Sequence, residues 1–346
     1  MSTARETVPI PAPVAGVAFR AFRGPGDYPG MAAANQAARD VAGIEEVVTP
    51  EGLARDYAHL VNCDLDRDLL IVERGDAVVG YARVEWRDLE NGSRSFTCLA
   101  LLQPDAVSTP AYDAMVGWAE GRQAAKARAI PADHARAGTL RTYTFGADTV
   151  LEAVLQGRGW TRTGQGYEMV RPTLDDIPEV PMPEGLEVRP LARDDVATRR
   201  IVWDAASEAF ADERDEAVPT EEDWQASLED PNEDPTLWVV AWDGDEVASA
   251  VLGKIDPDEN VHHGRERGLV DAVFTRRRWR RRGLARALIA RCLVLLRERG
   301  MSSAYLGVDG LNPNQAMDLY TGLGFGVAST SHDWTKPLPD PTMETT

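Results

Sequence analysis

Apolar positions recur along this chain with the two periods that distinguish strands from helices. The pattern is clearest at 269–300, where an apolar run over 269–274, interrupted by Asp271, predicts a strand. Beyond an arginine-rich turn, apolar residues three to four positions apart predict a helix with one buried face, and these are Leu284, Leu288, Cys292, Leu295 and Leu296. The segment therefore has the order strand, glycine-containing loop, helix.

The same order of elements runs twice through the chain: strand, two helices, three strands, helix, strand, helix, strand. The first half predicts strands at 17–22, 69–73, 77–84, 96–102, 140–144 and 166–170, and helices at 27–43, 49–61, 112–125 and 149–156. The second half predicts strands at 186–191, 237–242, 246–255, 269–274, 303–308 and from 324 to near 334, and helices at 193–211, 220–228, from 284 and at 313–321.

Turn and tail signals correspond between the halves. Gly75-Asp76 matches Gly244-Asp245, and Gly159-Trp160 matches Gly324-Phe325. The spacing of roughly 165 residues indicates a duplicated domain rather than a solenoid of short repeats.

Proline density marks the boundary between the halves. Pro172, Pro178, Pro181 and Pro183 fall within 171–185, which is too dense for a helix or a central strand, so this segment is predicted to be a linker. The predicted domains are 17–170 and 186–336, with a flexible N-terminus at 1–16 and a flexible tail at 337–346. A chain of 346 residues is long enough for two domains.

Composition and charge narrow the function classes. A net charge of −19 disfavours nucleic acid and anionic membranes as partners, because both attract basic surfaces. No apolar run approaches the roughly 18 residues needed to cross a membrane, and 1–16 lacks a signal-peptide core, which predicts a cytoplasmic protein. Cys63, Cys98 and Cys292 lie far apart without metal-ligand spacing, so neither a metal site nor a disulfide framework is predicted.

The loop before the helix at 284 has the features of an anion site. The first N–H groups of that helix point into the loop, and Gly283 lets the backbone approach a phosphate closely. The arginine cluster 276–282 stands out against the acidic background. It is either a solvated basic turn or a clamp for a small polyanion.

Arg280-x-x-Gly283-x-Ala285, placed between a strand and a helix, resembles the R/Q-x-x-G-x-G/A motif of the GNAT superfamily of acyl-CoA-dependent N-acyltransferases. The resemblance implies an α/β fold of two tandem GNAT-like domains, each a twisted mixed sheet flanked by helices and split beside its central strand. It also implies acetyl-CoA as the cofactor, with the loop cradling its pyrophosphate. The implied cofactor-binding residues are Val273, Phe274, Thr275, Arg280, Arg281, Arg282, Gly283, Leu284, Ala285, Arg286, Asn312 and Asn314.

A second segment, 312–325, resembles the family's N-x-x-(x)-A-x-x-L-Y-x-x-x-G-F pattern. Asn312 is placed to cap a helix that begins at Pro313. The family match implies that Tyr320 points at the sulfur of coenzyme A and protonates or stabilises the departing thiolate. The alternative is that Tyr320 only packs this helix against the sheet.

An amine nucleophile also needs a proton acceptor, because a protonated amine cannot attack a thioester. Asp271, on the central strand before the phosphate loop, is the best candidate by resemblance, although it could also be a hydrogen-bonded part of the sheet edge. His262 and His263, in the preceding loop, are alternatives. The backbone at Val273 and Thr275 is expected to bind the pantetheine amides and to stabilise the oxyanion near Val273.

The first half lacks these features. At the place of the phosphate loop, 103–111 has no glycine, two prolines that remove N–H donors, and the acidic Asp105. Leu155 stands opposite Tyr320 when the tails are aligned. The first domain is therefore expected to be a degenerate GNAT-like domain that walls the substrate pocket or serves as a scaffold, with retained binding of coenzyme A as the alternative.

The acceptor is the least specified part of the sequence. The acidic run 212–216 could attract a cationic amine, and Glu208, Asp212 and Glu213 are the candidate substrate residues. The tandem arrangement resembles that of mycothiol synthase, and equally that of tandem proteins acting on antibiotics or small amines. The predicted function is acetyl transfer to a primary amine of a small molecule, by a monomer or homodimer. The alternatives are an acyl-CoA-binding regulatory protein and an acetyltransferase for a peptide or protein amine.

Overall fold

The computed structural model describes residues 8–211, 215–310 and 316–338. The chain divides into two compact units that are not continuous halves. Unit 1 comprises residues up to Gln165 together with those from Ser331 onward, and unit 2 comprises Gly166–Thr330.

Unit 1 contains a mixed sheet in the order β1-β2-β3-β4-β5-β12. All neighbours are antiparallel except β4 and β5, which run parallel. The strands are β1 (Ala18–Ala21), β2 (Leu69–Arg74), β3 (Ala77–Asp88), β4 (Arg94–Leu102), β5 (Gly138–Phe145) and β12 (Gly326–Pro337).

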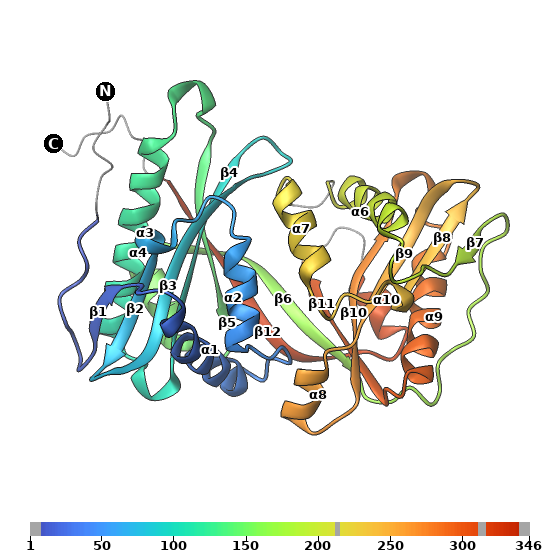
Figure 1. Cartoon of the computed structure of the whole chain (residues 1–346), viewed down its shortest axis with the longest axis horizontal. Coiled ribbons are helices and arrows are strands. Elements are labelled where there is room, and N and C mark those ends of the chain that lie inside the picture. The colour runs from blue at the N-terminus through green and yellow to red at the C-terminus, as the bar shows by residue number, and fades with distance from the viewer. Residues whose placement is uncertain (1–7, 212–214, 311–315, 339–346) are drawn as a thin grey trace. The chain divides into compact units, whose positions relative to one another are not determined.

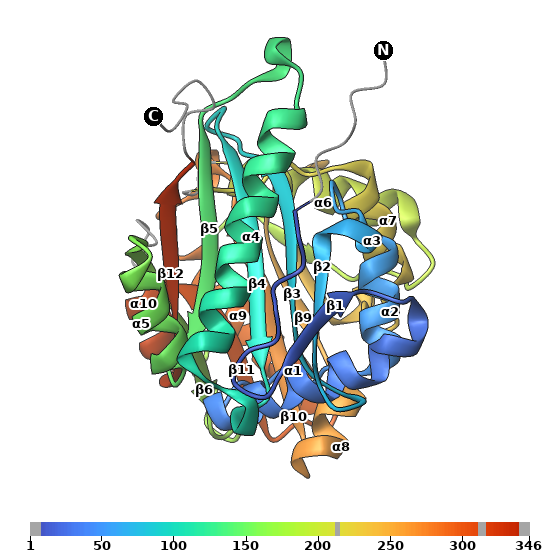
Figure 2. The same ribbon diagram turned by 90° about the vertical axis from the view of Figure 1, so that its left-hand side faces the viewer.

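Helices cover both faces of the unit 1 sheet, α1 and α2 on one face and α4 and α5 on the other (Figure 2). These helices are α1 (Tyr28–Ala42), α2 (Pro50–Ala58), α4 (Thr109–Ala129) and α5 (Thr149–Gly157), with a short α3 (Leu65–Asp68) before β2. Side chains alternate between the faces, as the two-residue period of a strand requires. In β2, for example, Leu70 and Val72 pack towards α4, whereas Leu69 and Ile71 pack towards α1.

Unit 2 contains a corresponding sheet in the order β6-β11-β10-β9-β8-β7, with α6 and α9 on opposite faces (Figure 1). Its strands are β6 (Thr161–Arg171), β7 (Glu187–Arg189), β8 (Trp238–Asp243), β9 (Glu246–Lys254), β10 (Arg267–Thr275) and β11 (Ser303–Asp309). Its helices are α6 (Val196–Phe210), α7 (Glu221–Glu229), α8 (Pro257–His263), α9 (Leu284–Glu298) and α10 (Ala316–Thr321). The predicted fold class, two tandem mixed sheets flanked by helices, is confirmed.

The last strand of each half completes the sheet of the other unit. β6, which ends the first half, pairs with β11 from Gly166 to Arg171. β12, which ends the second half, pairs with β5 from Ser331 to Pro337. The sequence predicts both strands but not their exchange.

Each sheet opens beside its central strand. In unit 2, β10 pairs with β11 only over Arg267–Leu269, whereas it pairs with β9 as far as Thr275. In unit 1, β4 likewise pairs with β5 only over Arg94–Thr97, whereas it pairs with β3 as far as Leu102. Beyond the split, the central strand of each unit has a partner strand on one side only.

Most predicted elements are found within a few residues of their expected bounds. The main omission is α8, because 257–263 was expected to be a loop. Its signals are nonetheless present: Asp256 accepts N–H groups of Asp258 and Glu259, Pro257 begins the helix, and Gly264 ends it at a φ of 63°. The expected start of the helix at 313 lies outside the described residues.

None of the helices described is both long and apolar enough to cross a membrane. All three cysteines are free, and burial raises the pKa of Cys63, Cys98 and Cys292 to about 12. Within the described ranges no group of His, Cys, Asp or Glu is arranged to hold a metal ion.

Candidate functional site

The split beside β10 coincides with a bulge at Asp271. The register with β9 shifts between Val270 and Ala272, which leaves Asp271 as the extra residue. The bulge reverses the alternation of side chains: Val270 packs towards α9, whereas Phe274, four positions on, packs towards α6. In a regular strand these two residues would share a face. The bulge thus places Asp271 and Ala272 together in the lining of one cavity.

The arginine-rich loop that follows β10 is anchored by Trp279. This side chain is 2% exposed, and its Nε1 donates to Asp243 at 2.9 Å. Arg276 and Arg278 stack on its ring, with guanidinium carbons 5.3 and 4.8 Å from the ring centroid. Arg278 also pairs with Glu246 at 2.8 Å. Part of the basic cluster therefore shapes the loop rather than offering charge to a ligand.

Arg280, the first residue of the phosphate-loop motif, has a positioning role in this structure. Its Nε donates to the carbonyl of Thr275 at 2.8 Å, and an Nη donates to the carbonyl of Ala209 at 3.0 Å. These bonds tie the loop to the end of β10 and to the end of α6.

The loop ends in two left-handed backbone positions. Arg281 has a φ of 61° and Gly283 a φ of 80°. The first is a rare conformation for a residue with a side chain, and such strain is concentrated at functional sites. A Cβ at position 283 would meet open space, so glycine is required there by the backbone angle and leaves the approach to the helix uncovered.

The N-terminus of α9 has no side-chain cap. Its first N–H groups, those of Leu284, Ala285 and Arg286, are therefore available as donors, and the helix dipole favours an anion there. Arg281 and Arg282 are exposed beside them. Uncapped donors, exposed cations and an open glycine together fit the pyrophosphate of acetyl-CoA.

The remaining residues predicted to contact the cofactor lie in several places. Val273 is half-buried, Phe274 is buried against Phe210 with centroids 6.0 Å apart, and the Thr275 hydroxyl lies 2.9 Å from that of Ser249. Arg286 donates to the carbonyl of Gly322 at 2.9 Å, which joins α9 to the segment after α10. Asn312 and Asn314 lie outside the described residues.

Tyr320 lies on α10 and is 7% exposed. Its ring packs edge-on against Phe325, with centroids 6.1 Å apart, within the same apolar cluster as α9 and β11. The side chain thus has a fixed position in unit 2, in the cluster on the α9 side of the sheet.

A cavity of about 240 Å³ lies on the other face of the sheet, between α6, α7, β8, β9 and the bulge of β10. Four aromatic side chains line it, together with three carboxylic acids. The aromatic residues are Trp203, Phe210, Trp224 and Trp238, and the acids are Glu216, Glu233 and Asp271.

Glu233 is the functional candidate that sequence reasoning missed. Its side chain is 16% exposed, and burial raises its pKa to about 7; Asp271 and Asp230 push in the same direction, while Lys254 and Arg199 oppose them. Lys254 pairs with Asp230 and lies 3.9 Å from Glu233. The available sequence signal was the acidic run 229–234, which has the composition of a solvated loop.

Of the predicted acceptor residues, only Glu208 lies in the described part of the chain, and it does not line this cavity. Glu208 is exposed on α6 and accepts two bonds from Arg276, at 2.6 and 3.0 Å. Asp212 and Glu213 lie outside the described residues. His262 and His263 end α8 and contact each other edge-on with centroids 4.7 Å apart, and neither lines the cavity.

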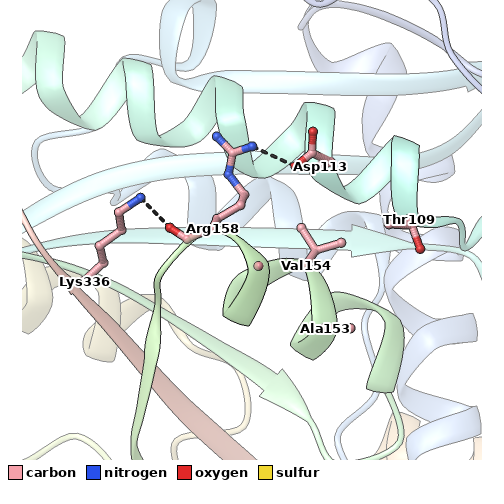
Figure 3. Close-up of a pocket in the computed structure, with 7 residues that line it drawn as sticks. Thr109, Asp113, Ala153, Val154, Arg158 and Lys336 are labelled. Carbon is pink, nitrogen blue, oxygen red and sulfur yellow. Dashed lines mark hydrogen bonds and ion pairs between the residues drawn. The ribbon is translucent and has the colours of Figure 1, made fainter.

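Unit 1 has an open cavity of about 440 Å³ between α4 and α5 (Figure 3). Its two basic groups are engaged with neighbours. Arg158 pairs with Asp113 at 2.7 Å and Glu120 at 2.8 Å, and Lys336 pairs with Glu120 at 2.9 Å and donates to the carbonyl of Arg158. Their charges are therefore largely neutralised within the unit.

Comparison with known proteins agrees with this geometry. Residues 197–325 match the Acetyltransferase (GNAT) family. A mycothiol acetyltransferase of Nocardiopsis dassonvillei is 30% identical over 58% of this chain and 66% of its own length, and one of Streptomyces scabiei is 28% identical over 74% and 75%. These alignments span about two thirds to three quarters of the relatives.

Solved structures show the same fold over nearly the whole chain. A GCN5-related N-acetyltransferase from Sphaerobacter thermophilus aligns with a TM-score of 0.72 at 23% identity, covering 96% of this chain and 98% of its own. A tandem GNAT protein from the clavulanic acid biosynthesis pathway aligns with a TM-score of 0.55 at 16% identity, covering 94% and 99%. Residues 197–325 therefore belong to the acetyltransferase (GNAT) family, and the chain as a whole has two tandem units of that fold.

Proposed function

We propose that this protein is an acetyl-CoA-dependent N-acetyltransferase that acts on a primary amine of a small molecule, and that unit 2 carries the reaction. One observation carries the proposal: the uncapped N-terminus of α9 follows the strand that bears both the split and the bulge at Asp271. The anion site and the cavity with its carboxylic acids are thus connected by a single strand. The names of the relatives, mycothiol acetyltransferases, support an amine of a small molecule as acceptor.

Different residues of unit 2 would bind the cofactor and stabilise the reacting groups in such a reaction. Acetyl-CoA supplies an acetyl thioester. The N–H groups of Leu284 and Ala285, with Arg281 and Arg282, would hold its pyrophosphate. The unpaired edge of β10 near Val273 offers backbone groups for the pantetheine amides and an N–H for the developing oxyanion.

Two side chains are proposed to manage protons. Asp271 stands at the bulge, in the cavity lining, where a carboxylate can bind the acceptor ammonium or receive its proton. Tyr320, held in place by Phe325, would give a proton to the departing sulfur.

Unit 1 is proposed to be silent towards the cofactor, because its corresponding helix start is capped. The Ser108 hydroxyl accepts the N–H of Ala111, and Pro110 has no N–H to offer. The unit would then act as a scaffold, as the sequence predicts.

Calorimetric titration of the full chain with acetyl-CoA tests the proposal, combined with thiol release in the presence of an amine library. We expect one binding site per chain and thiol release that depends on an amine. Two sites would show that unit 1 retains cofactor binding. No binding would overturn the proposal, and binding without thiol release for any small amine would favour a peptide or protein acceptor.

A further inference from the structure

The residues that line the aromatic cavity of unit 2 indicate which class of ligand it can bind. Trp203 and Trp224 meet edge-on with centroids 5.6 Å apart, and Trp224 and Trp238 are 5% and 8% exposed. The walls are therefore formed by well-packed rings on α6, α7 and β8. Such walls accommodate an apolar body of limited size, because the cavity measures only about 240 Å³.

Apart from the indole N–H groups of Trp203, Trp224 and Trp238, the side-chain polar groups of the lining offer acceptors. Glu216, Glu233 and Asp271 contribute carboxyl groups, and the hydroxyl protons of Ser207 and Ser227 are already donated to the carbonyls of Trp203 and Trp224, at 3.0 and 2.7 Å. An ammonium group, which only donates, matches such a lining. A polyhydroxylated acceptor would place several of its hydroxyls against the aromatic rings, away from the three carboxyl groups, which is costly in a partly buried site.

The charge around Glu233 also favours a cation. The groups that face it are Asp230 after α7, Asp271 on β10, Lys254 on β9 and Arg199 on α6, and Glu216 lines the same cavity. Lys254 is committed to Asp230, and Arg199 stacks on Trp238 at 5.6 Å and donates to the carbonyl of Ser227. When ionised, the four carboxylates outnumber the two cations, so an added positive charge is stabilised.

We propose that this cavity is the acceptor site, that it takes a compact apolar primary amine as its ammonium ion, and that Glu233 receives the proton that the amine must lose. This inference rests on the proposed function and specifies the substrate class of the same unit. It also separates this chain from enzymes whose acceptors carry several hydroxyl groups.

One N–H bond of the ammonium breaks and its proton moves to a Glu233 oxygen, which leaves a lone pair on nitrogen. That pair forms the C–N bond with the acetyl carbon as the C–S bond breaks, and the second proton lost by nitrogen ends on the sulfur. Glu233 then releases its proton to solvent. The raised pKa of Glu233 suits this role, because a base near the working pH accepts a proton more readily than a strongly acidic carboxylate does.

Phenethylamine and glucosamine are the discriminating probes, since both are primary amines but only the first is apolar. Binding is measured by calorimetry on the full chain, with and without saturating CoA, and acetylation by thiol release. We expect kcat/KM for phenethylamine to exceed that for glucosamine at least about 10-fold, which corresponds to the selectivity of an apolar pocket. Equal rates, a preference for glucosamine, or no phenethylamine binding in either condition would overturn the inference.

Filling the cavity tests its location. Ala206→Leu, in the lining on α6, should lower kcat/KM for phenethylamine at least about 10-fold and leave acetyl-CoA affinity unchanged. Ala197→Leu, on an exposed position of the same helix, is the matched control. Ser227→Leu fills the cavity from α7 if the first variant does not fold. Undiminished phenethylamine acetylation in a folded variant contradicts the proposed site.

Glu233→Gln tests the proton acceptor. It should lower kcat/KM about 100-fold and remove the rise in rate centred near pH 7, while acetyl-CoA affinity stays the same. Glu179→Gln, on an exposed residue of the same unit, controls for loss of a carboxylate. A retained pH profile would assign the proton step elsewhere. If the wild type does not bind acetyl-CoA, the proposed function is contradicted. Phenethylamine binding without CoA tests the cavity independently of that result.

Discussion

The helices that follow the two central strands, α4 in unit 1 and α9 in unit 2, begin in opposite ways. The start of α4 is closed by the Ser108 hydroxyl, by Pro110, and by an ion pair of 3.0 Å between the preceding Asp105 and Arg74. The start of α9 follows a left-handed glycine and has no side-chain cap. The same fold thus has one helix start whose donors are satisfied by the protein and one whose donors are left for the proposed anion.

The sheet faces that lie away from α4 and α9 also differ: that of unit 1 is filled, whereas that of unit 2 is partly open. In unit 1 the space between α1, α2 and the sheet is filled by Tyr28, Tyr57 and Tyr81, with Arg83 stacked over Tyr57 at 5.0 Å. In unit 2 the corresponding space contains the aromatic cavity. The central strand of unit 1 also keeps a regular register with β3, whereas β10 has its bulge. The two units thus differ at the positions for which function is proposed: those of unit 2 are less completely packed and paired than those of unit 1.

Closing the open helix end should have the largest effect. We expect Gly283→Glu to weaken acetyl-CoA binding at least about 1,000-fold. The added carboxylate would lie beside the pyrophosphate and repel it, whereas the uncapped N–H groups of the wild type would attract it. Gly300→Glu is a matched control, since Gly300 follows the other end of α9 with a φ of 91° and equally open surroundings. Calorimetry measures both. Equal loss in the two variants would attribute the effect to backbone strain rather than to the site.

The two units also differ at Tyr320 of unit 2, because Leu155 occupies the corresponding place in unit 1. We expect Tyr320→Phe to lower kcat about 100-fold without changing acetyl-CoA affinity, because only the hydroxyl that would protonate the sulfur is lost. Steady-state kinetics with a good amine acceptor measure it. Unchanged kcat would leave Tyr320 as a packing residue beside Phe325.

Two carboxyl groups should respond to pH with opposite sign. The pKa of Glu233 is raised to about 7 from 4.5, so the folded state holds its proton more tightly and loses stability as pH rises between these values. Although burial opposes it, bonding to Arg20 and the N–H of Arg23 holds the pKa of Asp27 in unit 1 below its ordinary value, so its stabilisation is lost as pH falls.

The free energy of unfolding at pH 8 therefore distinguishes a carboxyl group that destabilises the folded state from one that stabilises it. Glu233→Gln should stabilise the protein by about 1–3 kcal/mol, and Asp27→Asn should destabilise it by a similar amount. Destabilisation by both substitutions would show that Glu233 is a structural partner of Lys254.

The smallest effect is expected from removing the side-chain cap at the N-terminus of α4. Ser108→Ala should lower the free energy of unfolding by about 1 kcal/mol, the usual cost of a lost N-cap, and should not create a second acetyl-CoA site while Pro110 and Asp105 remain. Chemical denaturation and calorimetry check the two parts. A second site in this variant would mean that the cap alone silences unit 1.

Most elements could be predicted from the sequence because they depend on a local period of apolar residues; α8, which is marked only by its end residues, was not. The glycine turn and the helix that follows it could be predicted because Gly283 and α9 are neighbours in sequence. The bulge at Asp271 was not predicted, because an inserted residue only appears once the partner strand is known. Arg280 matched a motif, yet its bonds to Thr275 and Ala209 depend on tertiary contacts. Glu233 was missed because its burial is produced by residues distant in sequence.

The exchanged terminal strands have a consequence for synthesis of the chain. Unit 1 takes its last strand from residues Ser331 to Pro337, so β5 has no β12 partner until almost the whole polypeptide has been translated. Unit 2 takes β6 from residues made before the rest of it. Neither half cut out at the Pro-rich segment would carry a sheet with its native last strand. Each unit therefore needs residues from both halves of the sequence to complete its sheet, although the chemistry is proposed for only one unit.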